Sequence, residues 1–186
     1  MSRFDIQSLP LAGLNQIRRK PIGDGRGSLE RLFCQDDLAA AGWRKPIAQV
    51  NLTRTVARGT VRGLHYQQQP HAEMKLVTCL RGEVFDVIVD VRRGSPTFLR
   101  WQAVHLSAQE PVSVLIPEGC AHGFQSLTDD VELLYCHSAA YHAAAETGLR
   151  PTDPKLAIPW PLPVGTLSAR DAEHPLLTDQ FAGIEP

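Results

Sequence analysis

One segment of the chain brings together residue types that suit proton transfer beside a positive charge. The sequence RGLHYQ at 62–67 carries His65, and Glu73 and Lys75 follow it closely. An imidazole that titrates near neutral pH can act as a general base. Lys75 lies in the apolar run MKLVTCL, where a lysine is unusual unless it points into a polar cavity. An edge position or a side chain that snorkels to the surface is the alternative interpretation of Lys75.

Three further segments carry candidate functional groups. The turn PEGCAHGF at 117–124 leads to His122, and VELLY at 131–135 ends at Tyr135, with Tyr141 six residues later. The segment LSARD places Asp171 where its carboxylate could orient a histidine. Taken alone, a strand tyrosine such as Tyr135 is more often a core residue with a satisfied hydroxyl.

The spacing of Pro117 and His122 resembles half of the bicupin motif, in which PxGxxH supplies one metal ligand. The other half needs two histidines as HxH and a following glutamate, because a facial metal site takes two ligands from one strand. Here positions 65–67 read His-Tyr-Gln, so the second histidine is absent. His65, Glu73 and His122 remain as an incomplete metal set, and a metal-dependent isomerase or dioxygenase remains an alternative.

The elements that must position these groups are predicted to be strands. Short apolar or alternating segments recur about every ten residues, with Gly and Pro between them, which is typical of a sandwich or barrel. The strands are expected at 48–54, 74–80, 83–92, 97–106, 112–116, 121–127 and 130–138. On a strand at 62–67, alternation predicts Arg62 and Leu64 on one face and Gly63, His65 and Gln67 on the other.

Helices are expected only as short pieces. Residues 35–42 suit one helix, with Asp36 or Asp37 as the N-cap and Gly42 as the C-terminal stop. A second helical turn is expected at 168–173, with Ser168 as its cap. The whole chain, 1–186, is predicted to be a single domain with an N-terminal arm at about 1–30 and an extended, proline-rich segment at about 151–186.

Composition restricts the class of protein further. The net charge of -1 over 186 residues argues against a general nucleic-acid binder. The first twenty residues lack the pattern of a signal peptide, and no run approaches the length of a membrane span, so a cytoplasmic location is expected. The four cysteines form no CxxC pair, and Cys79 and Cys120 lie among apolar or small residues, so buried free thiols are expected there.

Several long motifs together resemble the dTDP-4-dehydrorhamnose 3,5-epimerase family. They are RGLHYQ, KLVTCLRGEVFDVIVDVRRGSPTF, IPEGCAHGFQSL, the spacing from Tyr135 to Tyr141, and DPKLAIPWP followed by LSARD. The resemblance runs from about Gly23 to Leu177. It implies an all-β, cupin-type double-stranded β-helix (jelly roll) with a few short helices at the ends. It also implies a homodimer that epimerises a nucleotide-linked 4-keto-6-deoxyhexose without metal or cofactor.

The same resemblance implies four catalytic roles. His65 would remove the proton from the carbon beside the ketone, Asp171 would pair with His65, Tyr135 would return a proton from the opposite face, and Lys75 would stabilise the enolate oxygen. The chemistry of the residues agrees with these roles. Inversion needs a base on one face and an acid on the other, and the developing oxyanion needs a fixed cation or donor.

Binding residues carry over one at a time. The positions that match those holding the nucleotide diphosphate and sugar are Arg26, Gln49, Asn51, Arg62 and His122. Tyr141 matches an aromatic residue that stacks on the base, and Glu146 matches another binding carboxylate.

The family commonly shows RGFFxE near residue 26, in a segment that reaches the neighbouring subunit's nucleotide site. Here the sequence is Arg26-Gly27-Ser28-Leu29-Glu30-Arg31, so Arg31 takes the place of that carboxylate unless Glu30 substitutes through a local shift. The expected substrate is dTDP-4-dehydro-6-deoxy-D-glucose, in dTDP-rhamnose and lipopolysaccharide synthesis. The charge reversal at Arg31 leaves the base open between dTDP, CDP and GDP. The inverted carbon is open between C3, C5 and both, because the same acid–base pair serves all three and the outcome depends on the shape of the pocket. A non-catalytic sugar-binding cupin is a further alternative.

Overall fold

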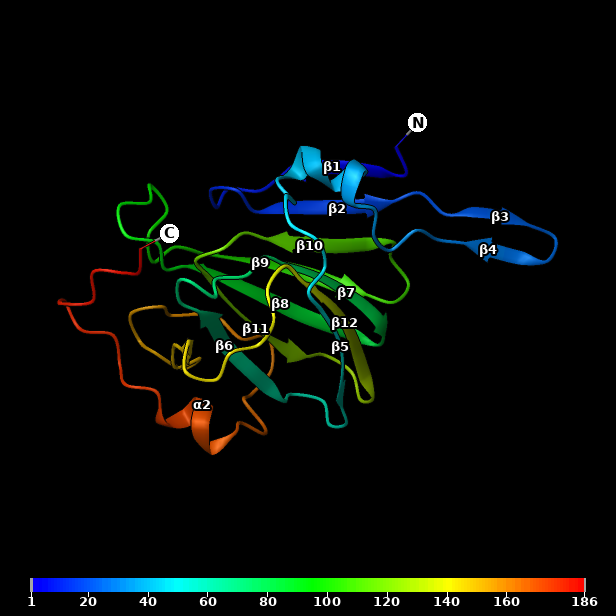
Figure 1. The fold of residues 1–186 in the computed structure, drawn as a ribbon. Coiled ribbons are helices and arrows are strands. Elements are labelled where there is room, and N and C mark those ends of the chain that lie inside the picture. The colour runs from blue at the N-terminus through cyan, green and yellow to red at the C-terminus, as the bar shows by residue number, and fades with distance from the viewer. Residues whose placement is uncertain (1, 186) are drawn as a thin grey trace.

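Two antiparallel sheets form the body of the computed structural model, which describes residues 2–185 (Figure 1). The six-stranded sheet has the order β1 (Phe4–Ser8), β2 (Asn15–Arg19), β10 (Val112–Ile116), β7 (Lys75–Arg81), β12 (Val131–His137), β5 (Gln49–Thr55). The five-stranded sheet has the order β13 (Glu146–Gly148), β6 (Val61–Gln67), β11 (Cys120–Ser126), β8 (Glu83–Asp90), β9 (Trp101–Ser107). This is the predicted cupin jelly roll.

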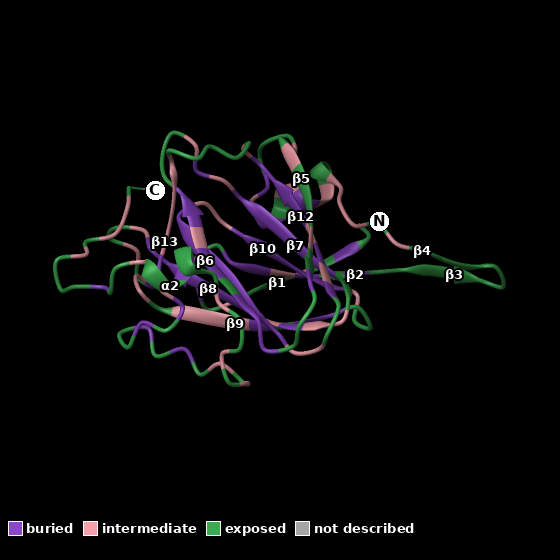
Figure 2. Cartoon of the chain, turned by 90° about the horizontal axis from the view of Figure 1, so that it is seen from below, coloured by how far each residue is buried: buried purple, intermediate pink, exposed green. Residues whose placement is uncertain are grey.

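The main hydrophobic core lies between the two sheets. Val77 and Leu133 from the six-stranded sheet belong to the same buried cluster as Ile88 and Phe124 from the five-stranded sheet. Burial of such apolar area contributes about 25 cal/mol per Å2, so this core stabilises the packing of one sheet on the other. Figure 2 shows the buried strands inside and exposed loops around them.

A second apolar cluster covers the outer face of the five-stranded sheet. Leu64 and Val87 project outward there and pack against Leu156, Ile158 and Leu177 of the C-terminal segment. The predicted extended segment at 151–186 therefore covers a sheet face. This explains why β8 is apolar at consecutive positions, since it is buried on both faces.

The N-terminal residues do more than form an arm. Strands β1 and β2 extend the six-stranded sheet, and only the hairpin of β3 (Ile22–Asp24) and β4 (Gly27–Leu29) projects away from the body (Figure 1). The strand predicted at 112–116 is confirmed at its two ends, and the strand predicted at 97–106 begins later, at Trp101. Residues 97–100 form a turn, in which Leu99 adopts a positive φ of 56°.

The two predicted helical pieces are confirmed with one correction. The first is helix α1 (Gln35–Leu38) followed by the 3-10 turn η1 (Ala39–Ala41), and Gly42 ends it with a left-handed φ of 98°. Its N-cap is Cys34 rather than Asp36 or Asp37, because the helix already begins at Gln35, so both aspartates lie inside the first turn. The second is α2 (Ala169–Glu173), capped as expected by Ser168.

The cysteines confirm one prediction made from composition. Cys79 and Cys120 are buried free thiols, and burial raises the pKa of Cys79 to about 11 and that of Cys120 to about 12. Within residues 2–185, none of the helices has the length and apolar character needed to cross a bilayer.

Candidate active site

A cavity of about 460 Å3 opens between the two sheets. Strands β5, β7 and β12 supply one wall, β6 and β11 supply another, and residues next to and within α2 complete the lining. All predicted site residues except two line this cavity; those that do are Gln49, Asn51, Arg62, His65, Lys75, His122, Tyr135, Tyr141, Glu146 and Asp171.

A bulge in β6 decides which of its side chains face the cavity. His65 pairs with His122 and Arg62 pairs with Phe124, so two residues of β6 oppose one of β11 between these pairs. Arg62 and His65 consequently both line the cavity, and the prediction that they occupy opposite faces is wrong. Gly63 permits the close approach, because it has φ 114° and a Cβ there would lie 2.5 Å from the Cα of Gly123.

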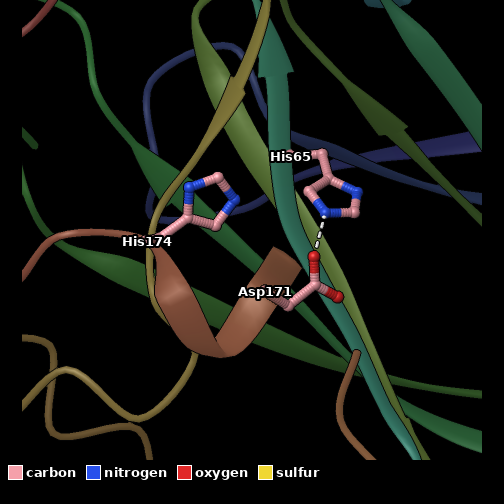
Figure 3. A group of neighbouring side chains, drawn as sticks. All are labelled: His65, Asp171 and His174. Carbon is pink, nitrogen blue, oxygen red and sulfur yellow. Dashed lines mark hydrogen bonds and ion pairs between the residues drawn. The ribbon is translucent and has the colours of Figure 1, made fainter. Parts of the chain in front are cut away.

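Asp171 holds the candidate base from the start of α2 (Figure 3). Its Oδ1 lies 2.7 Å from His65 Nε2, and its Oδ2 accepts the Gly63 backbone N–H at 3.2 Å. Burial would raise the pKa of Asp171, but the hydrogen bond and charge of His65 together with the bonds from Gly63 and Ser168 outweigh this effect, so the pKa is lowered and the group is ionised. An ionised carboxylate only accepts, so His65 Nε2 carries the proton and Nδ1 keeps its lone pair.

Lys75 is a fixed cation beside this pair. Its strand lies between β10 and β12, and its side chain is only 8% exposed, which rules out the edge or snorkelling interpretation. Its Nζ donates to the His65 carbonyl oxygen at 3.2 Å and lies 3.2 Å from Glu73. Burial would raise the pKa of Glu73, but His137 Nδ1, 2.8 Å away, and the charge of Lys75 lower it. Glu73 is therefore a carboxylate that orients the lysine.

Tyr135 lies across the cavity on β12, between two imidazoles. The ring centroids of His122 and His137 are each 5.8 Å from that of Tyr135. Burial raises the pKa of Tyr135 above its usual range, and the buried carboxylate of Asp86 adds to the effect. Asp86 also lies 2.7 Å from His122 Nε2. The phenol thus keeps its proton at neutral pH and can deliver it as an acid.

The outer part of the cavity carries polar groups suited to a phosphorylated ligand. Arg170 forms an ion pair with Glu146 at 2.7 Å, and Tyr141 is exposed beside them. Gln49 donates to Asn51 at 3.1 Å and accepts the backbone N–H of Tyr141 at 2.9 Å. Guanidinium groups bind phosphate oxygens through paired donors.

Sequence reasoning missed three cavity or supporting residues: Arg170, His137 and Asp86. Arg170 lies in the quoted LSARD segment, directly before Asp171. Asp86 interrupts the apolar strand β8, and an isolated buried acid is rarely present without a partner, so that interruption was a usable signal. Nothing local in the sequence distinguishes His137.

The two remaining predicted binding residues lie away from the cavity of their own chain. Arg26 projects from the β3–β4 hairpin and pairs with Asp24 at 2.6 Å. Arg31 pairs with Asp37 at 3.1 Å, and Glu30 pairs instead with Arg19 at 2.8 Å. The prediction that this segment serves a neighbouring subunit remains a prediction.

The three residues of the alternative metal site do not bring their ligand atoms together at one point. His65, Glu73 and His122 each bond to a different partner, as described above. Within residues 2–185, the single His/Cys/Asp/Glu group with ligand atoms all within 4.8 Å is His65, Asp171 and His174 (Figure 3). Burial, and then the proximity of His65, lower the pKa of His174.

The chain matches the family model described as dTDP-4-dehydrorhamnose 3,5-epimerase over residues 8–179. It is 39% identical to a dTDP-4-dehydrorhamnose 3,5-epimerase of Sinorhizobium fredii, over 94% of this chain and 90% of that protein. It is also 39% identical to a dTDP-4-dehydrorhamnose 3-epimerase of Streptomyces niveus, over 97% and 88% of the two chains.

Among solved structures, the chain resembles the dTDP-6-deoxy-D-glucose-3,5-epimerase of Legionella pneumophila in complex with dTDP-4-keto-L-rhamnose. The TM-score is 0.90 at 38% identity, and the match covers 98% of each chain.

Proposed function

The chain belongs to the dTDP-4-dehydrorhamnose 3,5-epimerase family, and from this membership we propose that His65 and Tyr135 exchange protons at the carbons beside its substrate's ketone. The protein is an isomerase that epimerises a nucleotide sugar. The proposed substrate is dTDP-4-dehydro-6-deoxy-D-glucose, in which the C4 ketone acidifies the protons on C3 and C5. The observation that carries the mechanism is the 2.7 Å contact between His65 and Asp171, in one cavity with Lys75 and Tyr135.

The first step is removal of a proton by His65 Nδ1. The C–H bond electrons move toward the ketone and form an enolate, while the imidazole becomes an imidazolium. Asp171 stabilises that cation because its carboxylate is ionised and only 5% exposed. Such a charge-assisted hydrogen bond contributes about 1.5–3 kcal/mol.

Lys75 stabilises the enolate oxygen. The ammonium is buried and fixed by Glu73 and the His65 carbonyl, so it need not reorganise as negative charge develops. Removal of one preorganised donor of this kind typically costs about 10^2 to 10^3 in rate.

The second step is return of a proton to the opposite face of the carbon by Tyr135. The raised pKa keeps the phenol protonated until the enolate is formed. A phenolate left in such a buried site must regain a proton before the next turnover, and His122 and His137 lie on its two sides. A base on one wall and an acid on the other give inversion rather than simple exchange.

The nucleotide part is proposed to bind at the outer end of the cavity, with Arg62 and Arg170 on the phosphates and Tyr141 against the base.

We further propose a homodimer in which the exposed β3–β4 hairpin brings Arg26 to the partner's site. Replacement of Arg26 by alanine should raise KM with little effect on kcat. If Arg26→Ala left KM unchanged in a protein that sediments as a dimer, this role would be wrong.

The test of the reaction is proton NMR in D2O with the thymidine, cytidine and guanosine forms of the 4-keto sugar. The wild-type protein should introduce deuterium at C3, C5 or both. His65→Ala should abolish exchange, and Tyr135→Phe should permit exchange while it impairs inversion. His105→Ala is the matched control, since His105 also pairs with a carboxylate, Glu83, on the exposed surface. Lack of exchange with all three nucleotides would refute the proposal, and binding without exchange would indicate a sugar-binding protein.

A further inference from the structure

His174, at the end of α2, points its ring toward the catalytic pair without taking part in the proposed reaction. Figure 3 shows its imidazole beside His65 and Asp171, and the centroids of the two histidine rings are 6.3 Å apart. Its Nε2 is buried, and no residue in 2–185 forms a hydrogen bond with it. A buried polar atom without a partner is uncommon and calls for an explanation.

The fold makes room for this ring at a defined place. Gly148 on β13 pairs with His65, and a Cβ on Gly148 would lie 2.4 Å from His174 Nε2. Only glycine therefore leaves the imidazole its present position. Arg150 Nε donates to the His174 carbonyl oxygen at 2.7 Å and fixes the end of the helix. The orientation of His174 thus results from contacts on two sides.

The three side chains form a donor set that suits a transition-metal ion. One ligand atom from each of His65, Asp171 and His174 lies within 4.8 Å of the others. Two imidazoles and one carboxylate, with a fourth position for water, are typical of zinc sites, with metal–ligand distances of about 2.0–2.2 Å. Ligand atoms around such an ion lie about 3.3–3.5 Å from one another. The 2.7 Å contact between His65 and Asp171 would therefore open slightly to admit the ion, and a side-chain rotation would bring His174 closer to both.

We propose that Zn2+ binds to His65, Asp171 and His174 and inhibits the enzyme reversibly. This inference rests on the proposed role of His65 as the base. On binding, the metal takes the place of the Nε2 proton between the imidazole and Asp171, and a proton from solvent occupies Nδ1, so the metal-bound imidazole stays neutral. With Nδ1 protonated, His65 has no lone pair to accept the substrate proton, and the carboxylate no longer supports an imidazolium.

This site differs from a cupin metal centre, which would draw its ligands from His65, Glu73 and His122. Glu73 and His122 stay engaged with Lys75 and Asp86, so zinc at the proposed site leaves the rest of the cavity unchanged. Substrate binding should therefore persist while proton transfer stops.

The test compares metal binding and activity in the full chain after removal of metals with a chelator. Equilibrium dialysis with Zn2+ should find about one tight ion per wild-type chain, and epimerisation should fall in parallel and return after chelation. His174→Gln should retain activity without zinc and need at least about tenfold more Zn2+ for the same inhibition. His105→Gln, the control at an exposed histidine–carboxylate pair, should behave as the wild type does.

A second readout does not depend on turnover. Co2+ in such a site should give a visible d–d spectrum in the wild-type protein and in His105→Gln, and this spectrum should be absent in His174→Gln and in a second variant, His174→Asn. Full activity at saturating Zn2+, or equal zinc sensitivity of the wild type and His174→Gln, would overturn the inference. A protein that binds Co2+ but epimerises no 4-keto sugar would refute the proposed function alone.

Discussion

The pairing of His65 with Asp171 makes a quantitative prediction for Asp171→Asn. The asparagine keeps the shape of the carboxylate and can still accept the Gly63 N–H, but it removes the negative charge. It also presents an amide N–H2 that can donate to His65 Nε2. A donor there would move the imidazole proton to Nδ1, the nitrogen that must take the substrate proton.

The magnitude follows from two losses. The charge-assisted hydrogen bond, at 2.7 Å from a carboxylate only 5% exposed, contributes about 1.5–3 kcal/mol to the imidazolium, or roughly 10- to 150-fold in rate. Stabilisation of the wrong tautomer adds to this, and in the serine-protease triad the equivalent change costs about 10^4. We expect Asp171→Asn to lower kcat by about 10^2 to 10^4, with a smaller change in KM.

The assay is single-turnover deuterium incorporation followed by NMR, because it reports the first proton transfer directly. Ser168→Ala is the control, since Ser168 caps α2 through the Asp171 N–H at 3.1 Å and its loss should cost about 1 kcal/mol of stability while the charge stays. An Asp171→Asn rate within about threefold of wild type, or a Ser168→Ala rate equally reduced, would mean that Asp171 acts only through the helix.

Three further outcomes are expected. Lys75→Met should slow deuterium exchange by about 10^2- to 10^3-fold in the same assay. It should also destabilise the fold, because Glu73 loses its cation. An unchanged exchange rate would exclude the role of Lys75 in stabilising the enolate. Gly63→Ala should lower the free energy of unfolding in urea by at least about 3 kcal/mol, since its Cβ would lie 2.5 Å from β11, whereas Gly25→Ala, with open space around it, should be near neutral. Asp90 is fully buried and its hydrogen bonds to Arg92, Ser95 and Thr97 outweigh burial and lower its pKa to about 2, so Asp90→Asn should cost about 2 kcal/mol at pH 7. Because the folded-state pKa is depressed, that difference should be present above about pH 4 and vanish as the pH falls toward about 2; equal losses at pH 7 and pH 2 in urea titrations would contradict it.

The strands and the chemistry of this chain were predictable for different reasons. Strand positions follow from apolar alternation and from Gly and Pro between the segments, which are local properties of the sequence. The pairing of His65 with Asp171 joins residues 106 positions apart, and only the family resemblance brought them together. The residue types alone named the possible chemistry without saying which groups meet.

The bulge in β6 shows the limit of local patterning. Alternation assigns Arg62 and His65 to opposite faces. In the pairing with β11, however, β6 has one extra residue between these two positions, so both side chains face the cavity. The register depends on contacts between β6 and β11, so the apolar alternation along β6 alone does not reveal it. Gly63 was the one local sign, because a glycine inside a strand often marks a bulge.

The choice of base also depends on placement rather than on residue type. Within residues 2–185, three histidines that line the cavity are paired with carboxylates: His65 with Asp171, His122 with Asp86, and His137 with Glu73. The His122 side chain is only 5% exposed, and His137 is 11% exposed with its Nε2 directed at Asn51, 3.4 Å away. The His65 side chain is 29% exposed, and its Nδ1 remains available after Nε2 is bonded. A substrate carbon can therefore approach the lone pair of His65, while the other two imidazoles flank Tyr135 and shape the wall from which the proton returns.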